Sequence, residues 1–404
     1  MQLHDDKQAN RADNIQGAEI RLPSEDLTAD LGFFMKTLGF RMDKIYPADY
    51  PTVSVLSGHG LTIRLEQDAS EPPGTLRILC RDPAALAGGE TVLTAPNGTR
   101  IEIVQADPPL EIPPTQHAFL VRRLKDNTPW VIGRAGMHYR DLVPGRLGGS
   151  IIASHIRIPD AGPVPDVVHY HTVGFQLIFA YRGEVKLVYE DQGPPFMLKA
   201  GDCVIQPPEI RHRVLESSEN LQVIEIGVPA DHVTTIDHEV ELPTRVLNPD
   251  RVFGGQTFCR HQLKDAVWEP WRLAGFEARE TGIGEATGGV ASVQVARATT
   301  GAKDGSAGGD ASGSDASGSG TDGGPDGRSP GGGEQVTSHT GDILFTFVME
   351  GEVTLNGENQ VAHRLEAGDA YVIPPHTKTS LTDRSADLEL LEVALPSQFE
   401  TIVH

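Results

Sequence analysis

The chain has 404 residues, which is too long for one compact core and predicts two or three domains. Its 56 acidic residues outnumber its 34 basic residues, and the formal charge of −22 argues against a nucleic-acid-binding surface. No apolar run approaches the roughly 20 residues that span a bilayer, and the first residues lack the apolar centre of a secretory signal, so we expect a cytoplasmic protein without a membrane partner.

Residues 1–107 predict a small α+β domain. Residues 17–24 have the composition of a strand, and residues 25–40 have the apolar spacing of an amphipathic helix with Ser24 as its N-cap. Further strands are expected at 41–47, 52–58 and 61–67. A shorter round of strand, helix, strand and strand follows up to residue 106, which suggests two similar halves.

An internal repeat organises the rest of the chain. Residues 124–130, LKDNTPW, recur as LKDAVWEPW at 263–271, and residues 168–185 align without a gap with 336–353. Both copies consist of short apolar runs separated by Gly, Pro and Asp turns, the pattern of an antiparallel barrel or double-sheet roll. We therefore expect a mainly β protein with domains at 1–107, 124–245 and 263–404.

The second copy contains a tract rich in Gly, Ser and Asp at about 301–334. Such sequence cannot bury enough apolar surface to offset the entropy lost on ordering, so a disordered insertion within a loop is expected. Repeat sequence lies on both sides of the tract, which therefore does not mark a domain boundary.

The stretch VVHYHTVGFQLIFAYRGEV, residues 167–185, places His169 and His171 two positions apart. Alternate side chains of a strand share a face, so these two imidazoles can converge on one ion. Two surface histidines on a strand would give the same pattern. The stretch alone leaves both interpretations open.

The repeat resembles the cupin family, and a chain with two copies resembles a bicupin. The first cupin motif has the form HxH, then an acidic residue, then glycine, and its positions are occupied here by His169, His171, Gln176 and Gly183. The second motif has glycine, proline and histidine, which are Gly201, Pro207 and His212. The resemblance implies that His169, His171 and His212 bind one divalent metal, with Fe(II) preferred and Mn(II), Ni(II), Cu(II) and Zn(II) as alternatives.

Gln176 departs from this pattern, because the family usually has glutamate there. A neutral amide can ligate weakly through its oxygen or hold a metal-bound water, but it cannot act as a base at neutral pH. The resemblance implies Gln176 as a further ligand and catalytic residue, and a buried amide bonded to backbone is the alternative. His171 and Gln176 are five positions apart, so a turn or bulge must lie between them if both face one ion.

His155 and Arg157 lie two positions apart on an expected strand that the roll would place near the metal. We consider them candidate catalytic or substrate-binding residues, with packing or surface exposure as the alternative.

The second repeat has lost most of these ligands. Thr337, Leu344 and Thr379 occupy the ligand positions and His339 alone is retained, so no metal is expected there. The first domain resembles the vicinal-oxygen-chelate, or glyoxalase-like, fold through residues 20–40. Gly17 stands where that family usually has a metal histidine, and Glu66 and Glu102 lack a histidine partner, so a metal-free module is expected.

One live three-histidine site in a bicupin resembles the ring-cleaving dioxygenases of the gentisate type. The resemblance implies a metal-dependent dioxygenase that cleaves a carbon–carbon bond of a small aromatic or enolisable substrate with O2. Two alternatives stay open: a non-catalytic small-molecule-binding or regulatory cupin with a structural metal, and a cupin isomerase or lyase. The expected partner is a small molecule, and homo-oligomers are compatible with the pattern.

Overall fold

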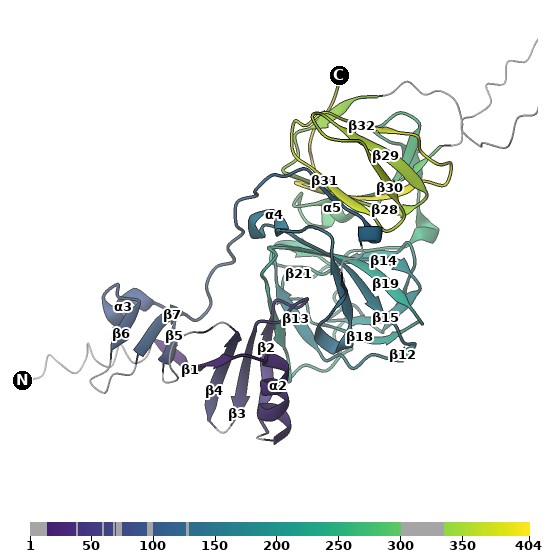
Figure 1. Cartoon of the computed structure of the whole chain (residues 1–404). Helices are drawn as coiled ribbons and strands as arrows, with labels where there is room; N and C mark the ends of the chain where they lie inside the picture. The colour runs from purple at the N-terminus through teal and green to yellow at the C-terminus, as the bar shows by residue number, and fades with distance from the viewer. Residues whose placement is uncertain are drawn as a thin grey trace, which may run out of the picture. The chain divides into compact units, whose positions relative to one another are not determined.

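The computed structural model describes residues 14–37, 39–58, 60–67, 69, 75–94, 100–126, 129–299 and 335–404. The expected insertion at about 301–334 lies outside the described residues. The chain is mainly β, as predicted (Figure 1). It divides into two units, the first of Met1–Gln116, Thr128–Leu263 and Ala286–Gly288, the second of His117–Asn127, Lys264–Glu285 and Gly289–His404. Among the described residues, no helix is both long and apolar enough to span a membrane.

The N-terminal part of the first unit is a sheet with the strand order β2-β3-β4-β1-β5-β7-β6. Its strands are β1 (Ile15–Ser24), β2 (Arg41–Tyr46), β3 (Val53–Gly58), β4 (Leu61–Gln67), β5 (Thr75–Cys80), β6 (Val92–Thr94) and β7 (Arg100–Gln105). β1 is parallel to β4 and β5 is parallel to β7, while the other pairs are antiparallel. The predicted strands of both rounds are therefore present.

The expected helix forms as α2 (Leu27–Gly32) followed by a π-helical turn, η1 (Phe33–Thr37). The prediction of Ser24 as its N-cap is wrong. The carboxylate of Asp26 accepts a hydrogen bond from the backbone amide of Ala29 (3.0 Å), whereas the Ser24 hydroxyl donates to Asp30. Leu27 packs on a small core of β3 and β4 side chains. A second short helix, α3 (Pro83–Ala87), is capped by Asp82.

The first repeat folds as two sheets around one core. One sheet has the order β16-β15-β18-β13-β20 and the other the order β23-β17-β14-β19-β11-β10-β9. The strands of the first sheet are β12 (Gly162–Pro163), β13 (His169–Thr172), β15 (Glu184–Tyr189), β16 (Phe196–Lys199), β18 (His212–Ser217) and β20 (Val233–Ile236). Those of the second are β9 (Val131–Ile132), β10 (His138–Asp141), β11 (Ile152–Ile158), β14 (Phe175–Arg182), β17 (Cys203–Ile205), β19 (Leu221–Val228) and β23 (Arg260–His261).

Side chains of both sheets meet in the interior. Ile156 and Val223 come from the second sheet and Leu187 and Tyr189 from the first, and all four are buried in one cluster. The remaining short elements of this unit are η3 (Arg134–Gly136), α4 (Arg146–Gly149), β21 (Val252–Phe253) and β22 (Gln256–Thr257). The first sheet also continues into the N-terminal domain, because β20 pairs with β2 through Thr234 and Ile45.

The second repeat has the same two-sheet plan. One sheet has the order β24-β25-β26-β33-β28-β31-β8, and the other has the order β30-β29-β32-β27-β34. The strands of the first are β8 (Leu120–Arg122), β24 (Trp268–Pro270), β25 (Phe276–Glu280), β26 (Ser292–Ala298), β28 (Ile343–Glu350), β31 (Ala370–Ile373) and β33 (Glu389–Leu395). Those of the second are β27 (Thr337–His339), β29 (Glu352–Gly357), β30 (His363–Glu366), β32 (Thr379–Thr382) and β34 (Thr401–Val403). α5 (Ile283–Ala286) is a single turn.

Each barrel is completed by the segment that precedes the other in the sequence. β8, which precedes the first barrel, pairs with β31 of the second, and β23, which precedes the second barrel, pairs with β17 of the first. The 3-10 turns η2 (Leu124–Asp126) and η4 (Leu263–Asp265) follow these two strands. We call residues 117–127 and 260–263 the exchanged arms. The structure thus places residues 117–126 in the second unit, whereas the predicted boundaries assigned 124–126 to the first barrel's domain, 124–245.

The repeated LKD sequence explains how the arms dock. The backbone amide of Leu124 donates to the Asp369 carboxylate (2.7 Å), and that of Leu263 donates to Asp202 (2.8 Å). The leucine side chains lie against the glycine that precedes each aspartate, Gly368 and Gly201. Both glycines have a positive φ, so a side chain there would be strained and would meet the leucine.

Candidate metal centre

Three histidines of the first barrel meet at the junction of β13 and β18. His169 of β13 lies directly opposite His212 of β18, and His171 lies two positions further along β13 on the same face. All three side chains are buried, and their ligand nitrogens lie within 4.8 Å of one another. The structure therefore brings together the three histidines that the sequence proposed as ligands.

Backbone carbonyls fix the orientation of two of these rings. Nδ1 of His169 donates to the carbonyl oxygen of Val167 (2.7 Å), and Nδ1 of His212 donates to that of Ile210 (2.9 Å). A carbonyl can only accept, so the proton of each neutral ring sits on Nδ1 and Nε2 carries the lone pair. This arrangement is the usual one for histidines that bind a metal through Nε2.

The third ring is held by Thr234. Nδ1 of His171 lies 2.9 Å from the Thr234 hydroxyl, which is fully buried. Thr234 lies in β20 between His171 of β13 and Ile45 of β2, so the N-terminal sheet backs the strand that orients this histidine.

Burial keeps the triad uncharged. It lowers the pKa of His212 to about 4. Burial, reinforced by the neighbouring cations and imidazoles, lowers the pKa of His169 and of His171 well below the ordinary histidine value. Neutral imidazoles are what a divalent metal requires as ligands, because binding need not first displace a proton.

Arg134 and Asp166 form a buried ion pair beside His169. Nη1 of Arg134 donates to the Asp166 carboxylate, and Nη2 lies 3.0 Å from Nε2 of His169. The other oxygen of Asp166 accepts a hydrogen bond from the backbone amide of Val214 (2.9 Å). Although burial opposes it, Arg134 and His169 hold the pKa of Asp166 at about 2. The Arg134 guanidinium thus donates to Nε2 of His169, the atom that would bind a metal.

Gln176 points to a carboxylate. Its Nε2 donates to Oε1 of Glu225 (2.7 Å), and its Oε1 is buried with no hydrogen-bond partner. Burial raises the pKa of Glu225 to about 7, although Gln176 and Arg134 oppose that shift. The alternative of an amide bonded to backbone is therefore not what the structure shows.

The expected interruption between His171 and Gln176 is present. β13 ends at Thr172 and β14 begins at Phe175, and the two strands belong to different sheets. Gly174 lies in the crossing, where its amide donates to Val228 (2.7 Å) and its carbonyl accepts from Gln256.

The structure places His155 and Arg157 on the other face of β11. Alternate residues of β11 share a face, and Ile156 is the one buried in the barrel core. His155 is bonded to Gln222 (2.8 Å) and Arg140 (3.2 Å), and Arg157 is bonded to Asn220. Burial, reinforced by Arg140, lowers the pKa of His155 to about 3. His155 and Arg157 therefore point to the face of β11 opposite Ile156, and their hydrogen bonds are made there and not with the triad.

The matching positions of the second barrel have a different chemistry. Thr337 lies directly opposite Thr379, as His169 lies opposite His212, and Nε2 of the surviving His339 is 3.0 Å from the carbonyl oxygen of Ile373. In the N-terminal domain, Glu66 and Glu102 both form ion pairs with Arg21.

Several residues of the site were not identified from the sequence: Arg134, Asp166, His232 and Thr234, which lie beside the triad, and Glu225, which is bonded to Gln176. The ring centre of His232 is 5.4 Å from that of His171, and its Nε2 is buried without a partner. A sequence signal existed for Asp166, three residues before His169, because carboxylates commonly accompany metal-binding histidines. The other four come from separate strands and loops that only the folded chain assembles.

Residues 328–393 match the family model described as Cupin domain. This match lies in the second repeat and supports the predicted cupin fold. No curated protein gave a match.

Several solved structures resemble the chain weakly. A salicylate 1,2-dioxygenase from Pseudaminobacter salicylatoxidans has 15% identity and a TM-score of 0.47 over 72% of this chain and 90% of its own. An oxalate decarboxylase variant from Bacillus subtilis has 11% identity and a TM-score of 0.46 over 72% and 81%. The protein Ylba from E. coli has 9% and 0.44 over 71% and 94%. With TM-scores below 0.5, these likenesses assign no activity or substrate to this chain.

Proposed function

We propose that the protein is a metal-dependent dioxygenase that cleaves a carbon–carbon bond of a small, anionic aromatic or enolisable substrate. The observation that carries the proposal is the triad of His169, His171 and His212, buried, neutral and oriented through Nδ1 so that the Nε2 atoms are left as ligands.

The donor set fits a divalent first-row ion such as Fe(II). Nitrogen ligands lie about 2.1 Å from such an ion. The ligand nitrogens of the three histidines already lie within 4.8 Å of one another, so small movements of the side chains would bring them to that distance. When bound, the ion would supply Lewis acidity and one-electron chemistry to couple a chelated substrate with O2. Incorporation of both oxygen atoms into the product requires no external reductant.

Gln176 supports this use of the site. Its amide nitrogen is engaged by Glu225, so its unpartnered Oε1 is the atom left to accept from a water or substrate hydroxyl, or to ligate weakly. Because the amide adds no negative charge, an ion held by three neutral rings keeps its full attraction for an anionic substrate.

Arg134 would bind the substrate's anionic oxygen. Its guanidinium is held by Asp166 and is already directed at His169, so it needs to move only within the site to face a chelated substrate. A fork of N–H donors suits carboxylate or enolate oxygens.

A second function is favoured by the same contact. Because Nη2 of Arg134 hydrogen bonds to Nε2 of His169, the three histidines and the arginine also form a metal-free set of donors. Such a set would bind a small anion without catalysing a reaction, and the protein would then be a binding or regulatory protein.

Oxygen consumption distinguishes the two functions. The protein loaded with Fe(II) would be supplied with catechols, hydroxybenzoates and β-diketones, with Zn(II)-loaded protein and the His171→Ala variant as controls. The dioxygenase should consume O2 with Fe(II) only, and ¹⁸O₂ should place two labelled atoms in the product. Tight ligand binding by calorimetry without any oxygen uptake would instead establish the binding protein.

A further inference from the structure

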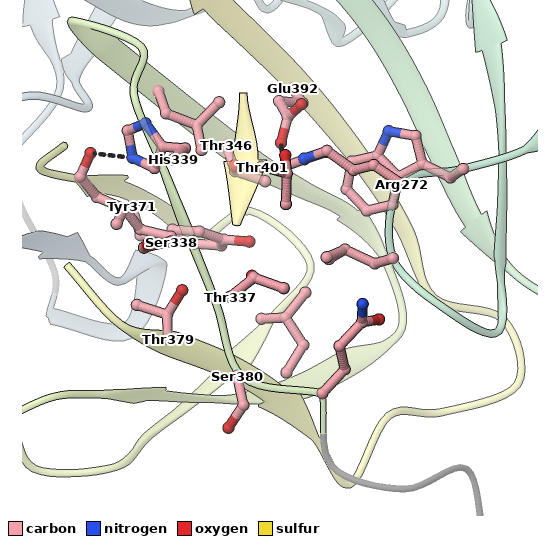
Figure 2. A pocket seen from close by; sticks show the side chains of 16 residues that line it. Arg272, Thr337, Ser338, His339, Thr346, Tyr371, Thr379, Ser380, Glu392 and Thr401 are labelled. Carbon is pink, nitrogen blue, oxygen red and sulfur yellow. Dashed lines mark hydrogen bonds and ion pairs between the residues drawn. The ribbon is translucent and has the colours of Figure 1, made fainter. Parts of the chain in front are cut away.

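The second barrel contains a cavity at the place where the first has its triad (Figure 2). Thr337 of β27 and Thr379 of β32, which face each other across the strands, are among its lining residues. Hydroxyl groups therefore stand where the first barrel has imidazoles. About 30 Å³ of the cavity is open to the centres of water-sized molecules.

One charged pair lies in the wall of this cavity. Nη2 of Arg272 donates to Oε2 of Glu392 (2.5 Å), as Figure 2 shows, and the Glu392 side chain is only 5% exposed. The Arg272 guanidinium also stacks on the Trp271 ring, 4.1 Å from its centre. The arginine is thus held in place by a carboxylate and an aromatic ring.

The same guanidinium has an unused donor. Nη1 of Arg272 is buried without a hydrogen-bond partner. A buried donor of a charged group is costly when left unpaired, so an acceptor atom entering the cavity would be stabilised there. The hydroxyls of Thr346 and Thr401 also line the cavity and can donate or accept.

The charges of the lining residues favour an uncharged ligand. Glu392 already offsets the charge of Arg272, so a second carboxylate at the same guanidinium would leave a net negative charge in a buried site. A hydroxyl group can instead accept from Nη1 and donate to a threonine oxygen or to Glu392. Seven of the sixteen lining residues have a hydroxyl group, which suits a ligand that has several hydroxyls of its own.

We propose that the second barrel binds a small uncharged polyol, in which hydroxyl oxygens accept from Arg272 and hydroxyl protons are donated to Glu392 and the lining threonines. The site is separate from the histidine triad and does not depend on the activity proposed there.

The test uses the full-length protein labelled with ¹⁵N-tryptophan. The chain has three tryptophans, and the indole signal of Trp271 can be assigned with Trp271→Phe. Glycerol and the closely matched anion glycerate would be titrated separately. We expect a saturable shift of the Trp271 signal with glycerol and a weaker response to glycerate, while Trp130 stays unchanged.

Two arginine variants give a matched comparison. Arg297 stacks on Trp268 (3.8 Å) and pairs with Glu277 (2.6 Å), as Arg272 does with Trp271 and Glu392, but it is not among the described lining residues. Arg272→Met should abolish the glycerol response and Arg297→Met should retain it. Thr379→Val leaves the ion pair of Arg272 and Glu392 intact and should weaken glycerol binding about fivefold. If Arg272→Met fails to fold, Thr379→Val tests the proposal in its place.

Three outcomes would overturn the proposal: no saturable shift of Trp271 with glycerol, tighter binding of glycerate than of glycerol, or an undiminished glycerol response in both Arg272→Met and Thr379→Val.

Discussion

The side-chain amide of Gln176 donates a hydrogen bond of 2.7 Å to the carboxylate of Glu225 on the neighbouring strand. The contact joins β14 to β19 and fixes which end of the amide is left unpaired. The carboxyl group that a motif glutamate would bring is thus present one strand away, at Glu225, and the residue at the motif position donates a hydrogen bond to it.

We expect Gln176→Glu to destabilise the metal-free protein by about 1–3 kcal/mol, because it removes a donor and places two carboxyl groups together in a buried site. Chemical denaturation at neutral pH would measure the loss. The exchanged variant, Gln176→Glu with Glu225→Gln, restores one donor and one carboxylate and should recover most of the stability. If the double variant is no more stable than Gln176→Glu alone, the pair does not act through this hydrogen bond.

The first barrel should bind one divalent metal per chain, because the triad is the one group of three metal-ligating side chains among the described residues. Elemental analysis of protein loaded with Fe(II) or Mn(II) and freed of excess metal would give the ratio. His171→Ala should abolish binding, since two imidazoles leave an incomplete shell. His339→Ala, at the matching position of the second barrel, is the control and should bind like the parent. Two metals per chain, or metal retained by His171→Ala, would contradict the assignment.

Arg134→Met should raise metal affinity by about tenfold or more. The substitution removes a positive charge directed at Nε2 of His169, and the metal then becomes the counter-charge of buried Asp166. Competition with a fluorescent chelator would measure the affinity. Without metal the same variant should be destabilised by about 3–5 kcal/mol, because Asp166 is left buried and unpaired.

Arg134→Lys is the control for this change, because it keeps the charge. We expect its metal affinity to remain near that of the parent. Equal affinities for all three proteins would show that the arginine does not compete with the ion.

Thr234→Val should weaken metal binding by about 10- to 100-fold without unfolding the protein, because it frees the ring of His171 to rotate. The neighbouring Thr235→Val provides a control on the same strand, since Thr235 points to the opposite face. Metal titrations and thermal melts of both variants would be compared. A similar loss in the two variants would indicate a general effect on β20 instead of an effect on the histidine.

Much of this arrangement could be predicted from sequence. Strand alternation within a short stretch of sequence placed His169 and His171 on one face, and the resemblance to the cupin family implied His212 as the third ligand. Arg134 and Thr234, which contact the triad, and Glu225, which contacts Gln176, could not be predicted in the same way, since these contacts depend on which segments become neighbours in the fold. The parity of β11 likewise decided against His155 and Arg157, because a one-residue change in register would have turned both inward.

The capping of α2 by Asp26 instead of Ser24 is a different kind of miss. Ser24 and Asp26 both have side chains that can cap a helix. The helix begins directly after Asp26, because the Asp26 carboxylate is the one that reaches the amide of Ala29.

The exchanged arms have a consequence for the order in which the protein can fold during synthesis. Leu124 emerges from the ribosome 245 residues before its partner Asp369, so the first arm must wait for almost the whole second barrel. Strand β17 of the first barrel likewise has an uncovered edge until β23 is made. Free strand edges favour pairing with other chains, and contacts so distant in sequence slow folding. A ribosome that stops between residues 236 and 260 would therefore release a first barrel with an open edge, prone to aggregate. Cutting the chain between the repeats would leave each fragment with the strand that belongs to the other barrel.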